Sequence, residues 1–165
     1  MNLQSILTLS AIVVALIIGL ISLVQTRNIK KEERKQRLLN EILDWARDLL
    51  MCGSEVFVHP TPGISPTARM AHGISSLYLR YRATNAKSKY VEKIASDFRQ
   101  NLLPDVLSVI SKLKELISLF EDSIGNLKSG KSINISTHKK TSDCELELYE
   151  LIRSLTVKVA EIKLK

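Results

Sequence analysis

The first 26 residues carry no charged side chain, and this feature most constrains what the chain can fold into. From Leu3 to Val24 the segment is dominated by Ile, Leu and Val. At a rise of ~1.5 Å per residue, a helix of this length spans roughly 33 Å, which is enough for a hydrocarbon core of ~30 Å. Residues 1–26 are therefore predicted to be a transmembrane anchor, with membrane contacts from Leu3, Ile6, Ile12, Ile17, Leu23 and Val24.

A basic cluster follows the apolar segment and predicts its orientation. Residues 27–37 carry six basic and two acidic side chains. Basic residues next to a membrane-spanning segment are retained on the cytoplasmic side. We therefore expect a single-pass protein of the plasma membrane, with its N-terminus outside and its C-terminus in the cytoplasm. The residues expected to set this topology and to face the lipid bilayer are Arg27, Lys30, Lys31, Arg34, Lys35 and Arg37.

A cleaved signal peptide is the alternative interpretation of the same segment. Signal peptides have a basic start, a shorter apolar core and small residues at the cleavage site. Residues 1–5 carry no basic side chain, and no A-x-A pattern follows the apolar run. The sequence favours an anchor that is not cleaved.

Ala11, Ala15 and Gly19 recur at every fourth position and so share one face of the predicted transmembrane helix. Small residues at this spacing allow two membrane helices to approach closely and pack. A homodimer formed through this face is one interpretation. The other is that Ala and Gly are frequent in membrane helices without any pairing role.

Residues 38–165 are predicted to form an all-α cytoplasmic domain. The six Gly and four Pro of the whole chain are too few for a loop-rich or β-sandwich domain. Apolar residues recur instead at steps of three and four, the period of an amphipathic helix. The first such stripe continues from the anchor without a break and comprises Leu38, Ile42, Trp45, Leu49 and Cys52. A second helix is expected from Ser65-Pro66 to about Gln100, marked by Met70, Ile74, Leu77, Tyr81, Val91, Ile94 and Phe98.

The third predicted helix has the most regular pattern, and the fourth begins after a polar loop. The third stripe comprises Val106, Ile110, Leu113, Ile117, Phe120, Ile124 and Leu127, broadened by Leu107, Val109, Leu116 and Leu119. This width favours an intramolecular bundle over a two-stranded coiled coil. A loop is expected from Ser129 to about Thr141, and Ser142 with Glu145 has the spacing of a capping box. The last stripe is Leu148, Ile152, Leu155, Val159 and Ile162, which completes an antiparallel bundle of about four helices.

The segment from Gly125 to Ser132 matches G-x-x-x-x-G-K-[ST], the phosphate-binding loop of many ATPases and GTPases. That loop requires a β-strand before it and a helix N-terminus directly after it. Residues 113–124 have helical periodicity instead, and no hydrophobic strand ending in Asp is present to hold magnesium. The segment is interpreted as a helix C-terminus followed by a loop, and nucleotide binding remains the alternative function.

The sequence predicts no catalytic, cofactor or metal site. His59, His72 and His138 share no ligand spacing with one another or with Cys52 and Cys144. In the cytoplasm both cysteines are expected to be reduced and to behave as small apolar residues. The chain carries no Gly-x-Ser-x-Gly motif. We therefore expect a protein that is not an enzyme.

Tyrosines alternate with basic residues between Tyr78 and Tyr90. Such a helix face could contact anionic lipid headgroups or nucleic acid, or it could be merely solvated. Nucleic acid is not expected, because the net charge of +7 is concentrated in two patches rather than spread over one broad basic face. The resulting hypothesis is a membrane-anchored, non-catalytic helical module that holds an unidentified protein partner, with residues 27–37 as its basic juxtamembrane segment.

Overall fold

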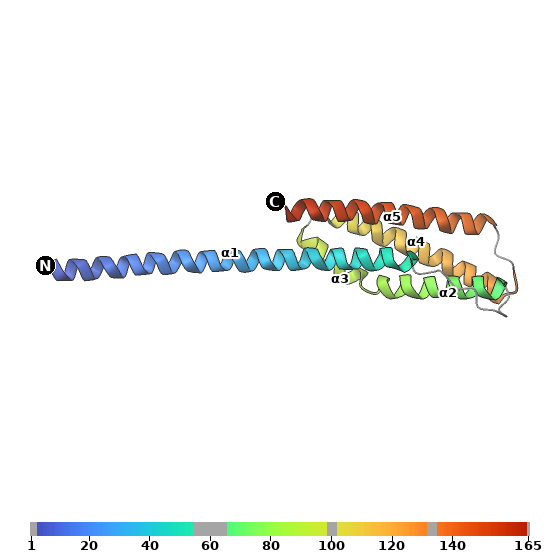
Figure 1. Cartoon of the computed structure of the whole chain (residues 1–165), viewed down its shortest axis with the longest axis horizontal. Coiled ribbons are helices and arrows are strands. Elements are labelled where there is room, and N and C mark those ends of the chain that lie inside the picture. Colours follow the sequence, from blue (N-terminus) through green and yellow to red (C-terminus); the bar gives the residue numbers. More distant parts are fainter. Residues whose placement is uncertain (1–2, 55–65, 99–101, 132–134, 165) are drawn as a thin grey trace. The chain divides into compact units, whose positions relative to one another are not determined.

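The computed structural model describes residues 3–54, 66–98, 102–131 and 135–164 (Figure 1). The described chain is all-helical and contains no strand. Its elements are α1 (Leu3–Ser54), α2 (Pro66–Asn85), α3 (Ser88–Asp97), α4 (Leu103–Lys128) and α5 (Ile135–Lys163). The chain divides into two compact units, Met1–Leu38 and Leu39–Lys165, and α1 contributes to both.

The described part of the first unit, residues 3–38, is entirely helical. The sequence explains this, because between Leu3 and Leu38 there is no Pro and a single Gly, so nothing interrupts the backbone hydrogen bonds. The hydroxyl of Thr26 donates to the carbonyl of Ser22 at 2.8 Å, one turn earlier. The predicted continuity of the helix from the apolar segment to Cys52 is confirmed, since α1 ends at Ser54.

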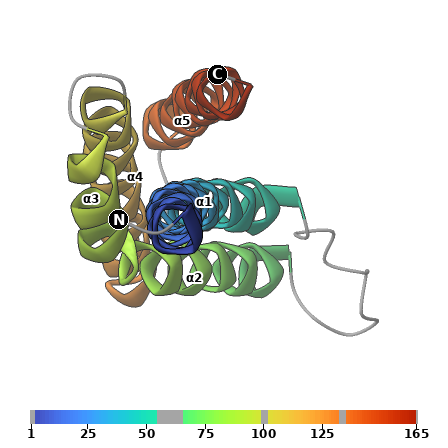
Figure 2. The same ribbon diagram turned by 90° about the vertical axis from the view of Figure 1, so that its left-hand side faces the viewer.

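The second unit is a helical bundle with a core of apolar side chains. α1 supplies Ile42, Trp45, Leu49 and Cys52 to this core, as the first predicted stripe requires, whereas Leu38 of that stripe is half-buried. Leu39 and Ala46 are also buried, because the apolar face of a core-facing helix is wide enough to bury more than one residue per turn. The helix α4 is shared by the packing of α2, α3 and α5 (Figure 2).

Polar contacts connect the part of α1 after Leu38 to α2 and to the turn that follows α2. The indole Nε1 of Trp45 donates to the carbonyl oxygen of Thr84 at 3.3 Å. Lys87 Nζ lies 2.7 Å from Asp48 Oδ2, and this ion pair raises the pKa of Lys87. Both groups of the pair are exposed, so water screens it and its contribution to stability is small. The burial of Trp45 therefore fixes α1 more than the ion pair does.

The stripe predicted for the third helix is confirmed by α4. Five of its members are buried, from Val106 to Phe120, whereas Ile124 and Leu127 near the end are half-buried. Val109 and Leu116 broaden the buried face as expected, but Leu107 is exposed. Pro104 lies in the first turn of α4, where its missing N–H costs no helical hydrogen bond.

The single helix predicted from Ser65 to Gln100 is wrong, because the chain forms two helices there. α2 ends at Asn85, residues 86–87 form a turn, and α3 runs only to Asp97. Ser88 is buried and its hydroxyl donates to Asn85 Oδ1 at 3.0 Å. Ser and Asn side chains compete with the backbone for hydrogen bonds and so favour turns over helix interiors. Apolar spacing alone does not report such a break. The predicted N-cap Ser65 lies outside the described residues.

The predicted start of the last helix at Ser142 is also wrong. α5 begins at Ile135, so half of the expected polar loop is helical. Thr137 and Thr141 continue the spacing of the buried residues Cys144 and Leu148, and both threonines are half-buried. Because these positions carry hydroxyls, a search for apolar residues ends the stripe too late. From Leu148 onward the predicted stripe is buried through Val159, and Ile162 is half-buried.

Candidate functional site

The predicted anchor residues all lie in α1. Leu3, Ile6 and Ile12 are helical, and their side chains lie outside the described part of the structure. Ile17, Leu23 and Val24 are all about half exposed, at 51%, 49% and 54%. Apolar side chains of this size are normally removed from water, so this segment requires another apolar environment.

Among the described residues, one helix segment, Val13–Gly53, contains a stretch long and apolar enough to cross a membrane. Length and composition alone are weak evidence, because the core helix of a soluble protein and a signal sequence meet the same test. Here none of the most apolar window is buried. That exposure distinguishes the segment from the core helix of a soluble protein and leaves the signal sequence as the alternative.

The basic cluster after the apolar segment is available to solvent. Of its six members, five are exposed: Arg27, Lys30, Lys31, Arg34 and Arg37. The sixth, Lys35, is half-buried and lies 3.3 Å from Glu32 one turn earlier. Because water reaches both side chains, this ion pair is weak. The cluster therefore keeps its positive charge free for an external partner.

Two of the three small residues, Ala15 and Gly19, are exposed, and the side chain of Ala11 lies outside the described part. A Cβ placed on Gly19 would meet no atom within 4 Å. Nothing within the described chain therefore requires a glycine at this position.

The segment that matches the phosphate-binding loop is the end of α4. Gly125 to Lys128 are helical, and Gly130 has a φ of 71°, the left-handed conformation that glycine adopts without strain. The N–H of Gly130 donates to the carbonyl of Leu127, and that of Lys131 donates to Asn126. This pair of bonds is a Schellman motif, which closes a helix C-terminus. These N–H groups are occupied by helix carbonyls and do not form a phosphate cradle. Ser132 lies outside the described residues.

The helix face on which tyrosines alternate with basic residues is partly engaged within the chain. Arg82 Nη1 donates to the hydroxyl of Tyr78 at 2.8 Å, and its guanidinium carbon lies 5.7 Å from the centre of that ring. Lys87 pairs with Asp48, and the Tyr90 hydroxyl donates to Glu41 Oε2 at 2.5 Å. These contacts give Arg82, Lys87 and Tyr90 structural roles within the bundle.

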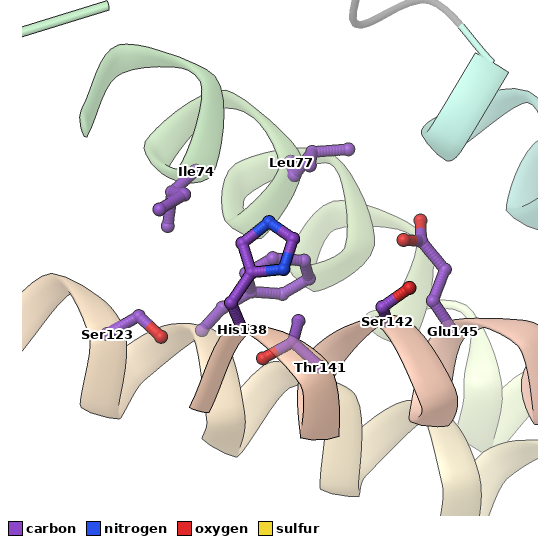
Figure 3. Close-up of a pocket in the computed structure, with 8 residues that line it drawn as sticks. Ile74, Leu77, Ser123, His138, Thr141, Ser142 and Glu145 are labelled. Carbon is purple, nitrogen blue, oxygen red and sulfur yellow. The ribbon is translucent and has the colours of Figure 1, made fainter. Parts of the chain in front are cut away.

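Three helices of the second unit line a cavity of about 160 Å³ that is partly open to solvent (Figure 3). Ile74 and Leu77 of α2 and Phe120 of α4 form its apolar side. The imidazole of His138 extends from α5 toward α2. The polar lining consists of Ser123, His138, Thr141, Ser142 and Glu145.

Two tyrosine hydroxyls lie beside this cavity and converge on Glu145, which is half-buried. The hydroxyl of Tyr81 donates to Glu145 Oε1 at 2.7 Å, and that of Tyr149 donates to the same oxygen at 3.1 Å. Tyr81 is fully buried, and its ring stacks on Phe120 with 5.9 Å between the ring centres. Burial and these neighbours raise the pKa of Tyr81 above its ordinary value, and burial also raises that of Tyr149. Both phenols therefore remain protonated donors at neutral pH.

The two cysteines are buried as free thiols, as predicted. The thiol of Cys52 donates to the carbonyl of Asp48 at 3.1 Å. Burial, with the nearby carboxylate of Glu115, raises the pKa of Cys144 to about 11. A thiol with a raised pKa and little exposure is a poor nucleophile. Among the described residues, no group of three or more His, Cys, Asp and Glu side chains is arranged to hold a metal ion.

The sequence did not indicate the cavity or the Tyr81–Glu145–Tyr149 group. Their members come from α2, α4 and α5, and in the sequence Glu145 resembles the other acidic residues of a solvated helix face. The available signal was Tyr81, an aromatic residue on an apolar stripe whose hydroxyl requires a partner when buried. No family of known proteins matches the chain, and neither a curated protein nor a solved structure matches it.

Proposed function

We propose that this protein is a single-pass membrane protein whose helical bundle lies in the cytoplasm of the cell and is anchored at the plasma membrane. The observation that carries the proposal is the run of exposed Ile, Leu and Val side chains on α1, followed directly by the exposed basic cluster from Arg27 to Arg37. Apolar side chains gain free energy on entering a bilayer, and the basic cluster favours the anionic cytoplasmic surface.

The proposed bundle is antiparallel. Asp105 near the start of α4 binds Lys158 near the end of α5 at 2.7 Å, whereas Lys112 farther along α4 binds Glu147 earlier in α5 at 2.6 Å. Contacts in opposite order along two helices support opposite directions. α1 also contacts α5, because Lys163 near the end of α5 donates a hydrogen bond to Asn40 of α1. The short helix α3 follows α2 after a turn at residues 86–87 and also packs on α4, so the two together take the place of one helix of a four-helix arrangement.

The proposed role is non-catalytic, namely to hold a protein partner at the membrane. Exposed apolar side chains on the bundle support it, among them Leu79 on α2 and Leu146 and Val157 on α5. Such residues contribute to protein interfaces when they are clustered with polar neighbours. Self-association as a homodimer through Ala11, Ala15 and Gly19 is part of the proposal, because Gly19 has open space around it.

Membrane fractionation tests the anchor. The full chain should remain in the pellet after alkaline carbonate extraction, whereas a chain that begins at Arg27 should be released, because it lacks the apolar segment. Intact mass of the membrane form separates the anchor from a signal sequence, since a cleaved chain is shorter at its N-terminus. Release of the full chain by carbonate, or a shortened mass, would contradict the proposal.

Cysteine labelling tests the orientation. Lys139 is exposed on α5, and Lys139→Cys provides a reactive thiol on a surface where the native thiols are buried. A membrane-impermeant maleimide should label this variant only after the cells are permeabilised. Equal labelling in intact cells would place the bundle outside.

Pairing of the anchor is tested in detergent micelles. Gly19→Ile should lower the dimer fraction measured by chemical crosslinking, because the larger side chain separates the two backbones. Val13→Ile is the matched control, since Val13 lies on the opposite face of α1. Equal crosslinking of Gly19→Ile and the wild type would exclude pairing through this face.

Nucleotide binding is the competing function, and the match from Gly125 to Ser132 is the observation in its favour. Equilibrium binding of ATP and GTP to the detergent-solubilised protein tests it, with Lys131→Ala as the control. Binding that depends on Lys131 would replace the scaffold proposal.

A further inference from the structure

The cavity between α2, α4 and α5 has the size of a small ligand. Its volume of about 160 Å³ is close to that of an engineered cavity of ~150 Å³ that binds benzene. A ligand there is limited to a single ring or a short alkyl chain with one polar group. The ring or alkyl chain would pack against the apolar side of the cavity, which is formed by Ile74, Leu77 and Phe120.

Two hydroxyls on the polar side of the cavity, those of Ser123 and Thr141, present hydrogen-bond acceptors, whereas His138 and Ser142 on the same side can also donate. Ser123 is almost fully buried, and its hydroxyl donates to the carbonyl of Leu119 at 2.8 Å. The hydroxyl of Thr141 donates to the carbonyl of Thr137 at 3.0 Å. Because each hydroxyl has a single hydrogen, both oxygens have only lone pairs left for a ligand.

Glu145 gives this acceptor set a negative charge. Its Oε1 accepts from the hydroxyls of Tyr81 and Tyr149, which are neutral donors. Among the described residues, no Lys, Arg or His lies within ion-pair distance of Glu145. A carboxylate next to an apolar cavity binds a cation more strongly than it would in water, because the local dielectric constant is lower.

We propose that this cavity is a binding site for a small organic ammonium, a protonated primary amine carried on a ring-sized apolar body. The ammonium donates to Glu145 and Thr141, which lie one turn apart on α5, and the apolar body packs against Ile74, Leu77 and Phe120. A carboxylate ligand is excluded by repulsion from Glu145, and a neutral alcohol lacks the charge that Glu145 selects. The site is independent of the membrane anchor and goes beyond the proposed scaffold function.

Methyl NMR of the full chain in neutral detergent micelles tests this proposal, with benzylammonium, benzyl alcohol and benzoate as probes. Benzylammonium should shift the methyl signals of Ile74 and Leu77 saturably, with at least tenfold tighter binding than benzyl alcohol and no binding of benzoate. Equal affinity for the amine and the alcohol, or shifts confined to methyl groups elsewhere, would overturn it.

Three variants provide the controls. Glu145→Gln keeps an oxygen that accepts from the two tyrosines but loses the charge, so it should weaken benzylammonium binding at least tenfold. Glu150→Gln makes the same change at an exposed position of α5 and should leave binding unchanged. Ile74→Trp fills the cavity and should abolish binding even if Glu145→Gln does not fold. Unchanged binding by either Glu145→Gln or Ile74→Trp, each checked for helicity, contradicts the proposal.

Discussion

At the scale of single residues, Gly53 of α1 closely approaches the side chain of Tyr149 on α5. A Cβ on Gly53 would overlap the Tyr149 hydroxyl and lie 2.9 Å from Glu145 Oε1. The last turn of α1 can therefore lie against α5 only because residue 53 has no side chain. The same tyrosine and glutamate are joined by a hydrogen bond beside the cavity, so this glycine positions part of the candidate site.

Gly53→Ala is expected to destabilise the protein by about 1–3 kcal/mol, because Tyr149 must move and its bond to Glu145 is disturbed. Gly125→Ala is the matched control. Gly125 is helical with nothing within 4 Å of its would-be Cβ, so alanine there should stabilise by about 0.5–1 kcal/mol. Urea unfolding followed by circular dichroism measures both changes. A neutral Gly53→Ala would show that the contact with Tyr149 relaxes freely.

The raised pKa of Cys144 makes stability depend on alkaline pH. Below about pH 9 the thiol is protonated in both the folded and the unfolded chain, so its contribution does not change. Between about pH 9 and 11 the unfolded chain loses the proton while the folded chain keeps it, and the free energy of unfolding falls. Cys144→Ala should reduce this fall when urea unfolding is compared at about pH 8 and pH 10.5. An identical fall in wild type and variant would show that Cys144 does not cause it.

At the scale of elements, α5 shows what spacing predicts and what it misses. Its buried face was predicted from Leu148 onward, because apolar residues at steps of three and four all lie on one side of a helix. Its first two turns were assigned to a loop. Thr137 and Thr141 hold the same positions of the helix with hydroxyls, and the hydroxyl of Thr141 donates to the carbonyl of Thr137. Side-chain polarity and helical position are therefore separate properties.

Leu148→Ala and Leu146→Ala compare the two faces of α5. Leu148 is fully buried, and its truncation should cost about 2–5 kcal/mol through lost burial and the cavity left behind. Leu146 is 61% exposed, so its truncation should change stability by less than about 0.5 kcal/mol. Thermal and urea unfolding of the two variants measure this difference. Similar losses for both would mean that Leu146 is covered in solution, as a partner or a second copy would cover it.

At the scale of the whole molecule, the unit Leu39–Lys165 contains its own core. A domain of this size buries enough apolar surface to fold alone. A chain of residues 39–165 should therefore be soluble, helical by circular dichroism and cooperative in urea unfolding. Loss of cooperativity would show that the preceding part of α1 contributes to the stability of the bundle.

The sequence by itself determined the helical class, the apolar segment before Arg27 and the basic cluster after it. These are local properties: period, length and charge along one segment decide them. It also determined most buried residues of α1, α4 and the later part of α5, because each amphipathic face is defined within its own helix. The break between α2 and α3 was decided by Asn85 and Ser88, which apolar spacing does not register.

Only the tertiary structure decided where three helices meet. The cavity, the convergence of Tyr81 and Tyr149 on Glu145 and the close approach at Gly53 depend on residues up to 96 positions apart, Gly53 and Tyr149 being the farthest. Helix packing brings these residues together through side-chain shape and distance, and neither is encoded in the pattern of one helix. The candidate ammonium site therefore follows from packing, whereas the proposed anchor follows from the sequence.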